Sequence, residues 1–594
     1  MCGISGIYNF GNSRPVCSST IDQMDAVQEY RGPDERGRHI EDRIGLGNRR
    51  LAIIDRAHGQ QPMSNDDKSV WITYNGEVYN YPELRADLEG RGYRFRSGSD
   101  TEVVLRSYEA YGEGCVDRFN GQFAFAIWDS RAPRLFLARD RLGIAPLHYA
   151  ERDGQFIFAS EAKALFRHPD VKPQIDHEAV VEALLCGTLF AGRTMFGGIR
   201  SLEPGYTMTV TPSGVARRQY WDIPLTAEGN GHDTEATYRE KLIPLLEDAL
   251  KIRLVGEVPW GMMLSGGTDS STLTSLATRM TPDPIQTFTI DFPNPWKLKT
   301  TDAHYARLMA EELRTKHREF MINPDDYYAT LEQVVYHLER PFNKGASTMY
   351  LLYKHLKDHA TVVITGEGAD ELFAGYVGER GLGLDEIVSS GAITELPWAA
   401  YWKVTSLLFN DDFARKVRPE EIFHQRLSDA LAQMDGGDPL NRGLYLYTKY
   451  FLLELLELHD RTSLAFGVEA RLPFLDHRFV ELTCPMPSSM KVKNGRTKHI
   501  FKDAVSHLLP SMIIDRKKTP MPIPRDPETL LRQTRLTREM ICDPNSRTAA
   551  YYDLRRVNDF LDRRAEFEGI DALSIWKVSM YLITLELLHR IYSL

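Results

Sequence analysis

Short apolar runs separated by turn residues dominate the first 215 positions of the chain. Runs of the strand type include residues 70–74 (VWITY), 123–128 (FAFAIW), 135–138, 156–159 and 206–210. Turn signals such as Asn75-Gly76 lie between them, and helical periodicity occurs at 21–28, 81–89 and 101–111. This pattern predicts an α+β domain of packed layers.

The pattern changes after residue 257. Apolar strands at 260–264, 286–292 and 361–365 alternate with helical segments at 271–278, 302–313, 324–337 and 349–359. Such alternation predicts a parallel sheet covered by helices on both faces. Beyond Tyr376 the chain is predicted to be almost wholly helical.

A stretch without strong periodicity separates the two halves. Residues 223–237 (IPLTAEGNGHDTEAT) indicate an exposed linker. A helix is predicted from Tyr238, with apolar residues at helical spacing through KLIPLLEDALKIRL. The predicted organisation is a first domain at 2–215, a linker at 216–236 and a second domain at 237–594.

Composition narrows the functional class. The 594 residues include 72 Lys and Arg and 82 Asp and Glu, a formal net charge of −10. This balance argues against nucleic-acid binding through bulk electrostatics, but it permits a local pocket for a phosphate-bearing ligand. The six cysteines lack metal-ligand spacing, and no apolar stretch suits a membrane span. We therefore expect a cytoplasmic protein with no nucleic-acid or membrane partner. Apolar faces in the helical residues 551–594 suit core packing or a homodimer.

A cysteine directly follows the first methionine. Removal of that methionine would place an α-amino group, which titrates near pH 8, beside a thiol that titrates near 8.5. Cys2 would then supply both a nucleophile and an adjacent base. Taken alone, a cysteine at this position is more typical of an incidental second residue.

Other polar positions of the first half suit the same chemistry. The turn RGPD could present Arg31, and Arg50 precedes the apolar run LAIID. An Asn amide and a Gly N–H at Asn75-Gly76 could form an oxyanion hole. Asp100 lies before a predicted helix, where it could bind an ammonium group or cap the helix. Singly, each feature is more typical of a turn or a cap.

Seven segments in this half, taken together, resemble the class II glutamine amidotransferase domain: MCGISGIY, RGPD, RLAIID, NGEVYN, SGSDTEVVL, GQFAFAIWD and RDRLGIAPLHY. The resemblance implies that Cys2 attacks the γ-carboxamide of glutamine and releases ammonia, with Asn75 and Gly76 as the oxyanion hole. The glutamine-binding residues that it implies are Arg50, Asn75, Glu77 and Asp100. A guanidinium and two carboxylates suit an amino-acid zwitterion.

The second half contains a Gly/Ser loop, SGGTDSS at 265–271, between a predicted strand and a helix. Its glycines allow close backbone approach, and the amides at the helix start can hold an anion. No Gly-Lys-Ser/Thr follows, so the loop is not a Walker A sequence. It resembles the pyrophosphate-binding loop of the ATP pyrophosphatase family, whose members adenylate a substrate.

A second acidic motif, TGEGADELFAGY at 365–376, also follows an apolar strand. Ligands bind at this end of the strands in open α/β sheets. Asp269 and Asp370 could hold Mg²⁺ against ATP phosphates, and Glu367 could position an acceptor or accept a proton from ammonium. Lys498, in GRTKHIFKDA, could stabilise charge on phosphate oxygens.

With DRTS (460–463) and EARLPFLD (469–476), these segments resemble the C-terminal half of glutamine-dependent asparagine synthetases. The resemblance implies an Ntn-hydrolase-like layered sandwich, followed by an α/β parallel-sheet ATP-pyrophosphatase domain with a large helical C-terminal part. It implies that ATP adenylates a carboxylate, most often that of aspartate, and that ammonia from the Cys2 site reaches the acyl-AMP through an internal passage. The catalytic residues then include Glu367 and Lys498. The ATP-binding residues that it implies are Leu264, Ser265, Gly266, Gly267, Asp269, Ser270, Ser271, Ile290, Thr365 and Gly366.

Several positions depart from the family pattern: Thr268, Asp302, Arg340, the lack of a proline near Thr348, and Pro520-Met521. They represent either loop drift or an acceptor other than aspartate, and Arg340 in the pocket would favour an additional anionic group. Two further alternatives are a glutamine-independent, β-lactam-like synthetase and a catalytically silent scaffold. Cys2 argues against the first, and Lys498 against the second.

Overall fold

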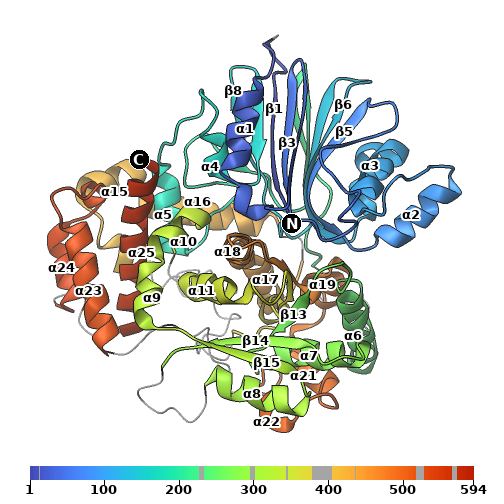
Figure 1. Cartoon of the computed structure of the whole chain (residues 1–594). Helices are drawn as coiled ribbons and strands as arrows, with labels where there is room; N and C mark the ends of the chain where they lie inside the picture. Colours follow the sequence, from blue (N-terminus) through green and yellow to red (C-terminus); the bar gives the residue numbers. More distant parts are fainter. Residues whose placement is uncertain are drawn as a thin grey trace.

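The computed structural model describes residues 1–12, 14–225, 233–293, 301–342, 345–376, 404–434, 436–516, 523, 527–564, 567 and 572–594. Figure 1 shows a strand-rich domain at the top and a helix-rich domain below it. Every helix in these ranges is too short or too polar to cross a membrane. Part of the predicted linker, residues 226–232, lies outside the described residues.

Two six-stranded antiparallel sheets form the first domain, in the orders β10-β8-β9-β1-β3-β2 and β12-β11-β7-β6-β5-β4. The strands are β1 (Gly3–Tyr8), β2 (Glu35–Glu41), β3 (Ile44–Arg50), β4 (Met63–Ser64), β5 (Val70–Val78), β6 (Gly121–Asp129), β7 (Arg134–Arg139), β8 (His148–Arg152), β9 (Gln155–Ala159), β10 (Arg200–Ser201), β11 (Tyr206–Thr211) and β12 (Gly214–Gln219). The helices are α1 (Ser18–Ala26), α2 (Tyr81–Gly90), α3 (Asp100–Tyr111), α4 (Ala162–Leu165) and α5 (His177–Cys186).

The apolar pattern did not predict β1 and β3, although they pair along their full length, from Gly3 opposite Arg49 to Tyr8 opposite Ile44. Both strands are rich in glycine, which strand statistics disfavour. The glycines are needed for packing. A Cβ on Gly6 would lie 2.3 Å from the ring of Phe158. Tertiary packing therefore overrides local propensity in the strand that follows Cys2.

A buried carboxyl group lies under this sheet. Asp25 of α1 is fully buried and accepts a hydrogen bond from Ser5 Oγ at 2.7 Å. A Cβ on Gly47 would approach the Asp25 carboxyl to 2.4 Å, so the group is closely packed. Burial raises the pKa of Asp25 to about 7. The carboxyl is therefore neutral in the folded protein at mildly acidic pH.

Asp25→Asn is expected to flatten the pH dependence of stability. Because the pKa of Asp25 is higher in the folded than in the unfolded protein, its contribution to stability is complete below about pH 4 and is lost as the pH rises through about 7. Each pKa unit is worth about 1.4 kcal/mol, so the loss above pH 7 is on the order of 4 kcal/mol. Between pH 5.5 and pH 8, the midpoint of thermal unfolding should fall less in the variant than in the wild-type protein. Equal falls in both proteins would contradict this assignment.

The second domain contains a five-stranded parallel sheet in the order β15-β14-β13-β16-β17. Its strands are β13 (Trp260–Met263), β14 (Gln286–Asp291), β15 (Lys316–Met321), β16 (Val362–Ile364) and β17 (Glu469–Arg471). The helices are α6 (Glu235–Lys251), α7 (Thr268–Met280), α8 (Asp302–Glu312), α9 (Pro324–Ala329), α10 (Leu331–Leu338), α11 (Ala346–Leu356), α12 (Ala369–Leu372), α15 (Asp411–Val417), α16 (Pro419–Ala432), α17 (Pro439–Leu446), α18 (Leu452–Leu464), α19 (His477–Thr483), α20 (Ser488–Lys491), α21 (His499–Ala504), α22 (Ser511–Ile514), α23 (Pro527–Ile541), α24 (Leu554–Leu561) and α25 (Ala572–Tyr592).

The predicted fold class is confirmed, with local differences. The helix predicted at 324–337 is two helices, α9 and α10, which meet at Thr330. The edge strands β15 and β17 were not predicted, because β15 is largely polar and β17 has three residues. The apolar positions of α25 are buried against α10 and α23 of the same chain. A homodimer and the exact domain limits stay predictions.

A network of buried charges joins the two domains. The first domain contributes Arg31, Glu161 and Lys163, and the second contributes Glu339, Asp460 and Arg461. Arg461 Nη1 lies 2.7 Å from Glu161 Oε1. Burial opposes ionisation, but the three cations hold the pKa of Glu161 well below its usual range. Loss of one partner would leave a buried charge uncompensated, so the network fixes the domains against each other.

Candidate functional site

Three of the four residues predicted for glutamine binding, Arg50, Glu77 and Asp100, line one pocket beside Cys2, and the fourth, Asn75, contacts the Cys2 backbone. Cys2 precedes β1, Arg50 ends β3, Glu77 lies on β5 and Asp100 begins α3. The pocket is lined by Met1, Cys2, Arg50, Leu51, Ile53, Ile54, Gln61, Tyr74, Gly76, Glu77, Ser99, Asp100 and Thr101. Residues that are 100 positions apart in sequence therefore converge on the thiol.

Asn75 and Gly76 offer hydrogen-bond donors next to the thiol. Asn75 Oδ1 accepts the Cys2 N–H at 2.6 Å, which fixes the amide group. Asn75 Nδ2 is buried and has no hydrogen-bond partner among the described residues. Gly76 has a φ of +145°, and a Cβ there would lie 2.1 Å from Gln122 O. A buried, unpaired amide donor beside a nucleophile fits an oxyanion hole.

Arg50 and Asp100 are held in place by contacts within the first domain. Arg50 Nη1 lies 2.9 Å from Glu35 Oε2, and its Nη2 donates to the carbonyl groups of Ile54 and Asp55 at 2.9 Å each. Asp100 Oδ2 accepts the Tyr74 hydroxyl at 2.8 Å. A preformed guanidinium and a preformed carboxylate suit the two charged groups of an amino acid.

The ionisation of the Glu77 carboxyl depends on two residues of the second domain. Burial, and then Asp100 and Glu469, raise the pKa of Glu77 well above its usual range, whereas Arg471 lowers it. Arg471 Nη2 lies 3.7 Å from Glu77 Oε1. Glu469 and Arg471 lie on β17, and the sequence analysis assigned them no role in the pocket. The motif EARLPFLD was the available signal, because it places two opposite charges within a buried segment.

The first residue also contacts this strand. The amino group of Met1 pairs with the buried carboxylate of Glu469. Burial raises the pKa of the Cys2 thiol, while the Met1 amino group and Arg50 oppose the rise. Removal of Met1 stays a prediction. It would place the α-amino group at the Cys2 nitrogen, which now contacts Asn75.

The Gly/Ser loop forms the second centre, between β13 and α7. Ser265 contacts Ser270 Oγ through its N–H at 3.2 Å and through its hydroxyl at 3.1 Å. Gly266 has a φ of +67°, and a Cβ there would lie 2.3 Å from the backbone of Tyr305. Only glycine fits this position, so the loop must keep its tight shape. Ser271 is fully buried within α7.

Lys498 joins the two predicted metal-binding carboxylates. Its Nζ lies 2.6 Å from Asp269 Oδ2 and 2.6 Å from Asp370 Oδ1. Burial lowers the pKa of Lys498, but the two carboxylates outweigh this effect and raise it. A Cβ on Gly375 would lie 1.7 Å from Asp370 Oδ1, so this approach also requires glycine. The predicted acidic pair and Lys498, which was predicted from a separate segment, thus form one charged cluster.

The remaining predicted residues lie at the C-terminal ends of adjacent parallel strands. Leu264 follows β13, Ile290 is on β14, and Thr365, Gly366 and Glu367 follow β16. This is the edge at which open α/β sheets bind ligands. The Glu367 side chain is 30% exposed, and its Oε1 lies 3.2 Å from His459 Nε2. His459 was not among the residues predicted from the sequence.

Arg516 is a further cation that the sequence analysis did not assign. It donates to Ser265 O at 3.0 Å and pairs with Asp302. It therefore brings a second positive charge to the Gly/Ser loop, and its sequence signal was the basic run RKKT. Among the departures from the family pattern, Thr268 donates to Ile513 O. Pro520-Met521 lie outside the described residues.

Arg340 does not supply an unpaired charge for an acceptor. It is buried, and its guanidinium lies 3.8 Å from Glu454 and 3.3 Å from Glu457, both on α18. Burial opposes its ionised form, but these carboxylates raise its pKa. The charge that we considered for acceptor recognition is therefore compensated within the protein.

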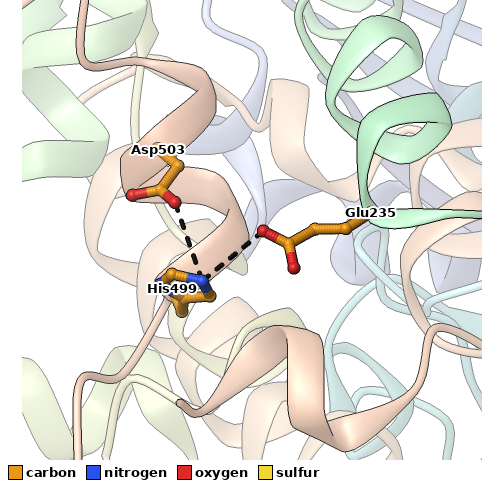
Figure 2. Close-up of side chains that lie close together, drawn as sticks. All are labelled: Glu235, His499 and Asp503. Atoms are coloured by element: carbon orange, nitrogen blue, oxygen red, sulfur yellow. Dashed lines mark ion pairs between the residues drawn. The ribbon is translucent and has the colours of Figure 1, made fainter. Parts of the chain in front are cut away.

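Figure 2 shows a third cluster, in which Glu235 of α6 and Asp503 of α21 face the ring of His499. Both carboxylates lie 3.6 Å from His499 Nε2. Each is also paired with a cation, Glu235 with Lys493 and Asp503 with Arg496. These contacts tie the first helix of the second domain to the helix that begins after Lys498.

Comparison with known proteins matches both halves of the chain. The family model described as "Asparagine synthase" matches residues 241–590, and the one described as "Glutamine amidotransferase domain" matches residues 1–221. The chain belongs to the asparagine synthase family. Glutamine-hydrolyzing asparagine synthetase 3 of Bacillus subtilis is 33% identical over 551 residues, which cover 89% of this chain and 88% of the relative. Asparagine synthetase 1 of the same organism is 29% identical, with 98% and 96% covered.

Membership of the asparagine synthase family confirms the resemblance drawn from the sequence motifs. Each of the two matched domains contains one of the two centres: the pocket beside Cys2 lies in the first, and the Gly/Ser loop with Lys498 lies in the second. A glutamine-dependent amidotransferase joined to an ATP-using ligase is the chemistry supported by these matches. The buried charge network holds the two parts together.

Proposed function

We propose that this chain is a glutamine-hydrolysing asparagine synthetase that amidates the side-chain carboxylate of aspartate. The observation that carries the proposal is the coexistence of two complete polar centres in one chain. One contains Cys2 and Asn75 Nδ2, a buried donor without a hydrogen-bond partner among the described residues, and the other contains Lys498 between Asp269 and Asp370. The relatives named above, glutamine-hydrolyzing asparagine synthetases, support the choice of product.

At the first centre, Cys2 Sγ attacks the γ-carboxamide carbon of glutamine. The oxyanion that forms accepts hydrogen bonds from Asn75 Nδ2 and the Gly76 N–H. Arg50 binds the α-carboxylate, while Glu77 and Asp100 bind the α-ammonium group. Ammonia leaves, and water releases glutamate from the thioester, so that glutamine and water give glutamate and ammonia.

At the second centre, a carboxylate oxygen of the acceptor attacks the α-phosphorus of ATP and pyrophosphate leaves. The Gly/Ser loop and Lys498 hold the phosphate oxygens, whose charge grows as the P–O bond breaks. Ammonia then attacks the acyl carbon, AMP leaves, and Glu367 takes the proton from the new ammonium. The amide, AMP, pyrophosphate and one proton are the products.

In this proposal, Asp269 and Asp370 are the residues that would hold Mg²⁺. Carboxylate oxygens are the ligands that Mg²⁺ prefers, and their shared contact with Lys498 Nζ shows that the two carboxylates lie close together, so the donor set fits. When bound, Mg²⁺ would neutralise charge on the ATP phosphates. Lys498 orients the same carboxylates without the metal.

Acceptor-dependent release of pyrophosphate tests the proposal. Purified protein with ATP, Mg²⁺ and glutamine should release pyrophosphate when aspartate is added, and asparagine should accumulate in equal amounts. Glutamate and succinate serve as comparison acceptors, and free ammonium serves as the comparison nitrogen donor. Pyrophosphate release that aspartate does not raise above background would refute aspartate as the acceptor. Release with ammonium but never with glutamine would favour the glutamine-independent alternative.

A further inference from the structure

Helix α18 belongs to the second domain and lies where that domain meets the first, below the strands of the first domain in Figure 1. Its consecutive residues His459 and Asp460 are both buried, with 3% and 6% of their surface exposed. Although they are neighbours in sequence, His459 contacts Glu367 of the second centre, whereas Asp460 contacts Arg31, which in turn contacts Cys2.

His459 faces the second centre. Its Nε2 lies 3.2 Å from Glu367 Oε1, and its Nδ1 lies 3.0 Å from the Tyr353 hydroxyl. Burial, with Glu367 and Asp460 nearby, raises the pKa of Tyr353 well above its usual range, so this hydroxyl stays protonated. A protonated hydroxyl can donate to Nδ1, which leaves the Nε2–H directed at the carboxylate. The ring is thus fixed from both sides.

Asp460 faces the first centre through one intermediary. Its two carboxylate oxygens accept from Arg31 Nη1 at 2.8 Å and from Nη2 at 2.9 Å. Arg31 Nε then donates to the carbonyl oxygen of Cys2 at 3.0 Å. A bidentate pair defines the plane of the guanidinium. Because Arg31 is fully buried, few other positions are open to it.

We propose that His459 and Asp460 are positioning residues, one for each centre. His459 orients the Glu367 carboxylate for amide formation, and Asp460, through Arg31, holds the backbone of the nucleophile Cys2. Because both residues lie on one turn of α18, a movement of this helix changes the two centres together. The inference rests on the proposed function, since it assigns roles within those two reactions.

Three variants of α18 test the proposal in the full-length protein. His459→Leu should lower kcat for amide formation from ammonium by at least about 10-fold, with KM for ATP little changed and most glutaminase activity retained. His459→Gln, which keeps a side-chain donor, should restore part of that loss. Asp460→Asn should lower kcat for glutamate release by at least about 10-fold and should affect the ammonium-dependent reaction less. Thr462→Val is the matched control, because its hydroxyl bonds within the helix to Leu458 O.

The ratio of glutaminase activity to ammonium-dependent amide formation decides the result. Opposite changes in this ratio for His459→Leu and Asp460→Asn, with no change for Thr462→Val, would support the proposal. Equal losses of both activities in either variant would show a general packing role and overturn the proposal. A failure of His459→Gln to recover part of the activity lost in His459→Leu would overturn it as well. If the wild-type protein lacked either reaction, the proposed function itself would fail. Thermal midpoints would confirm that each variant is folded.

Discussion

Replacement of Cys2 by alanine is expected to abolish product formation from glutamine while product formation from ammonium continues. The thiol lies in the pocket with Arg50 and Asp100, so its loss removes the nucleophile and leaves the binding groups in place. Glutamate release should fall by at least about 10³-fold, because the covalent route is lost. The ammonium-dependent reaction should stay within a few fold, since it uses residues of the other domain. Chromatographic measurement of glutamate and asparagine distinguishes the two reactions.

Cys17→Ala is the matched control for this experiment, because Cys17 is an exposed thiol outside the pocket. It should leave both reactions unchanged. Glutamate release that survives in Cys2→Ala would contradict the assigned nucleophile. The intact mass of an active preparation provides a separate check: loss of Met1 is expected, and full activity with Met1 retained would show that a free α-amino group at Cys2 is not needed.

Replacement of Lys498 by methionine is expected to remove aspartate-dependent exchange between ATP and pyrophosphate. Lys498 is the cation shared by Asp269 and Asp370. The variant therefore leaves two largely buried carboxylates close together without the positive charge that compensates them. It also removes a donor to the phosphate oxygens in the transition state. The exchange rate should fall by about 10²–10³-fold.

Glutaminase activity serves as the internal control for this variant, because the first centre should keep working if the protein is folded. Lys493→Met is the matched substitution, since Lys493 is a half-exposed lysine in the same region that pairs with Glu235. It should leave the exchange rate within about twofold of wild type. An exchange rate in Lys498→Met close to that of wild type would contradict the role assigned to this side chain.

The fold class and most candidate residues could be predicted because their signals are local. An apolar strand followed by a Gly/Ser turn and a helix specifies the loop at 265–271, and the structure places it between β13 and α7. The candidate residues of NGE were likewise found from short spacing, although the turn predicted at Asn75-Gly76 is part of β5, which pairs with β6 through Val78. Such signals depend on a few neighbouring residues, so they can be read without tertiary contacts.

Other features have no local signal. The strand β17 has three residues, and nothing in its own sequence shows that Arg471 reaches Glu77 or that Glu469 reaches the Met1 amino group. Arg340 illustrates the converse: its sequence position suggested an anion site, but the structure pairs it with two carboxylates of α18. Charges on distant segments can be matched only after the chain has folded.

The sequence by itself therefore determined the fold class and the candidates for the nucleophile, the nucleotide loop and the acidic pair, since each depends on residue type and short spacing. The tertiary structure decided how these parts are held. It placed Lys498 between Asp269 and Asp370 across more than 100 residues of chain, and it directed two consecutive residues of α18 to different centres. The physical reason is that hydrophobic periodicity is local, whereas the pairing of buried charges depends on which segments packing brings together.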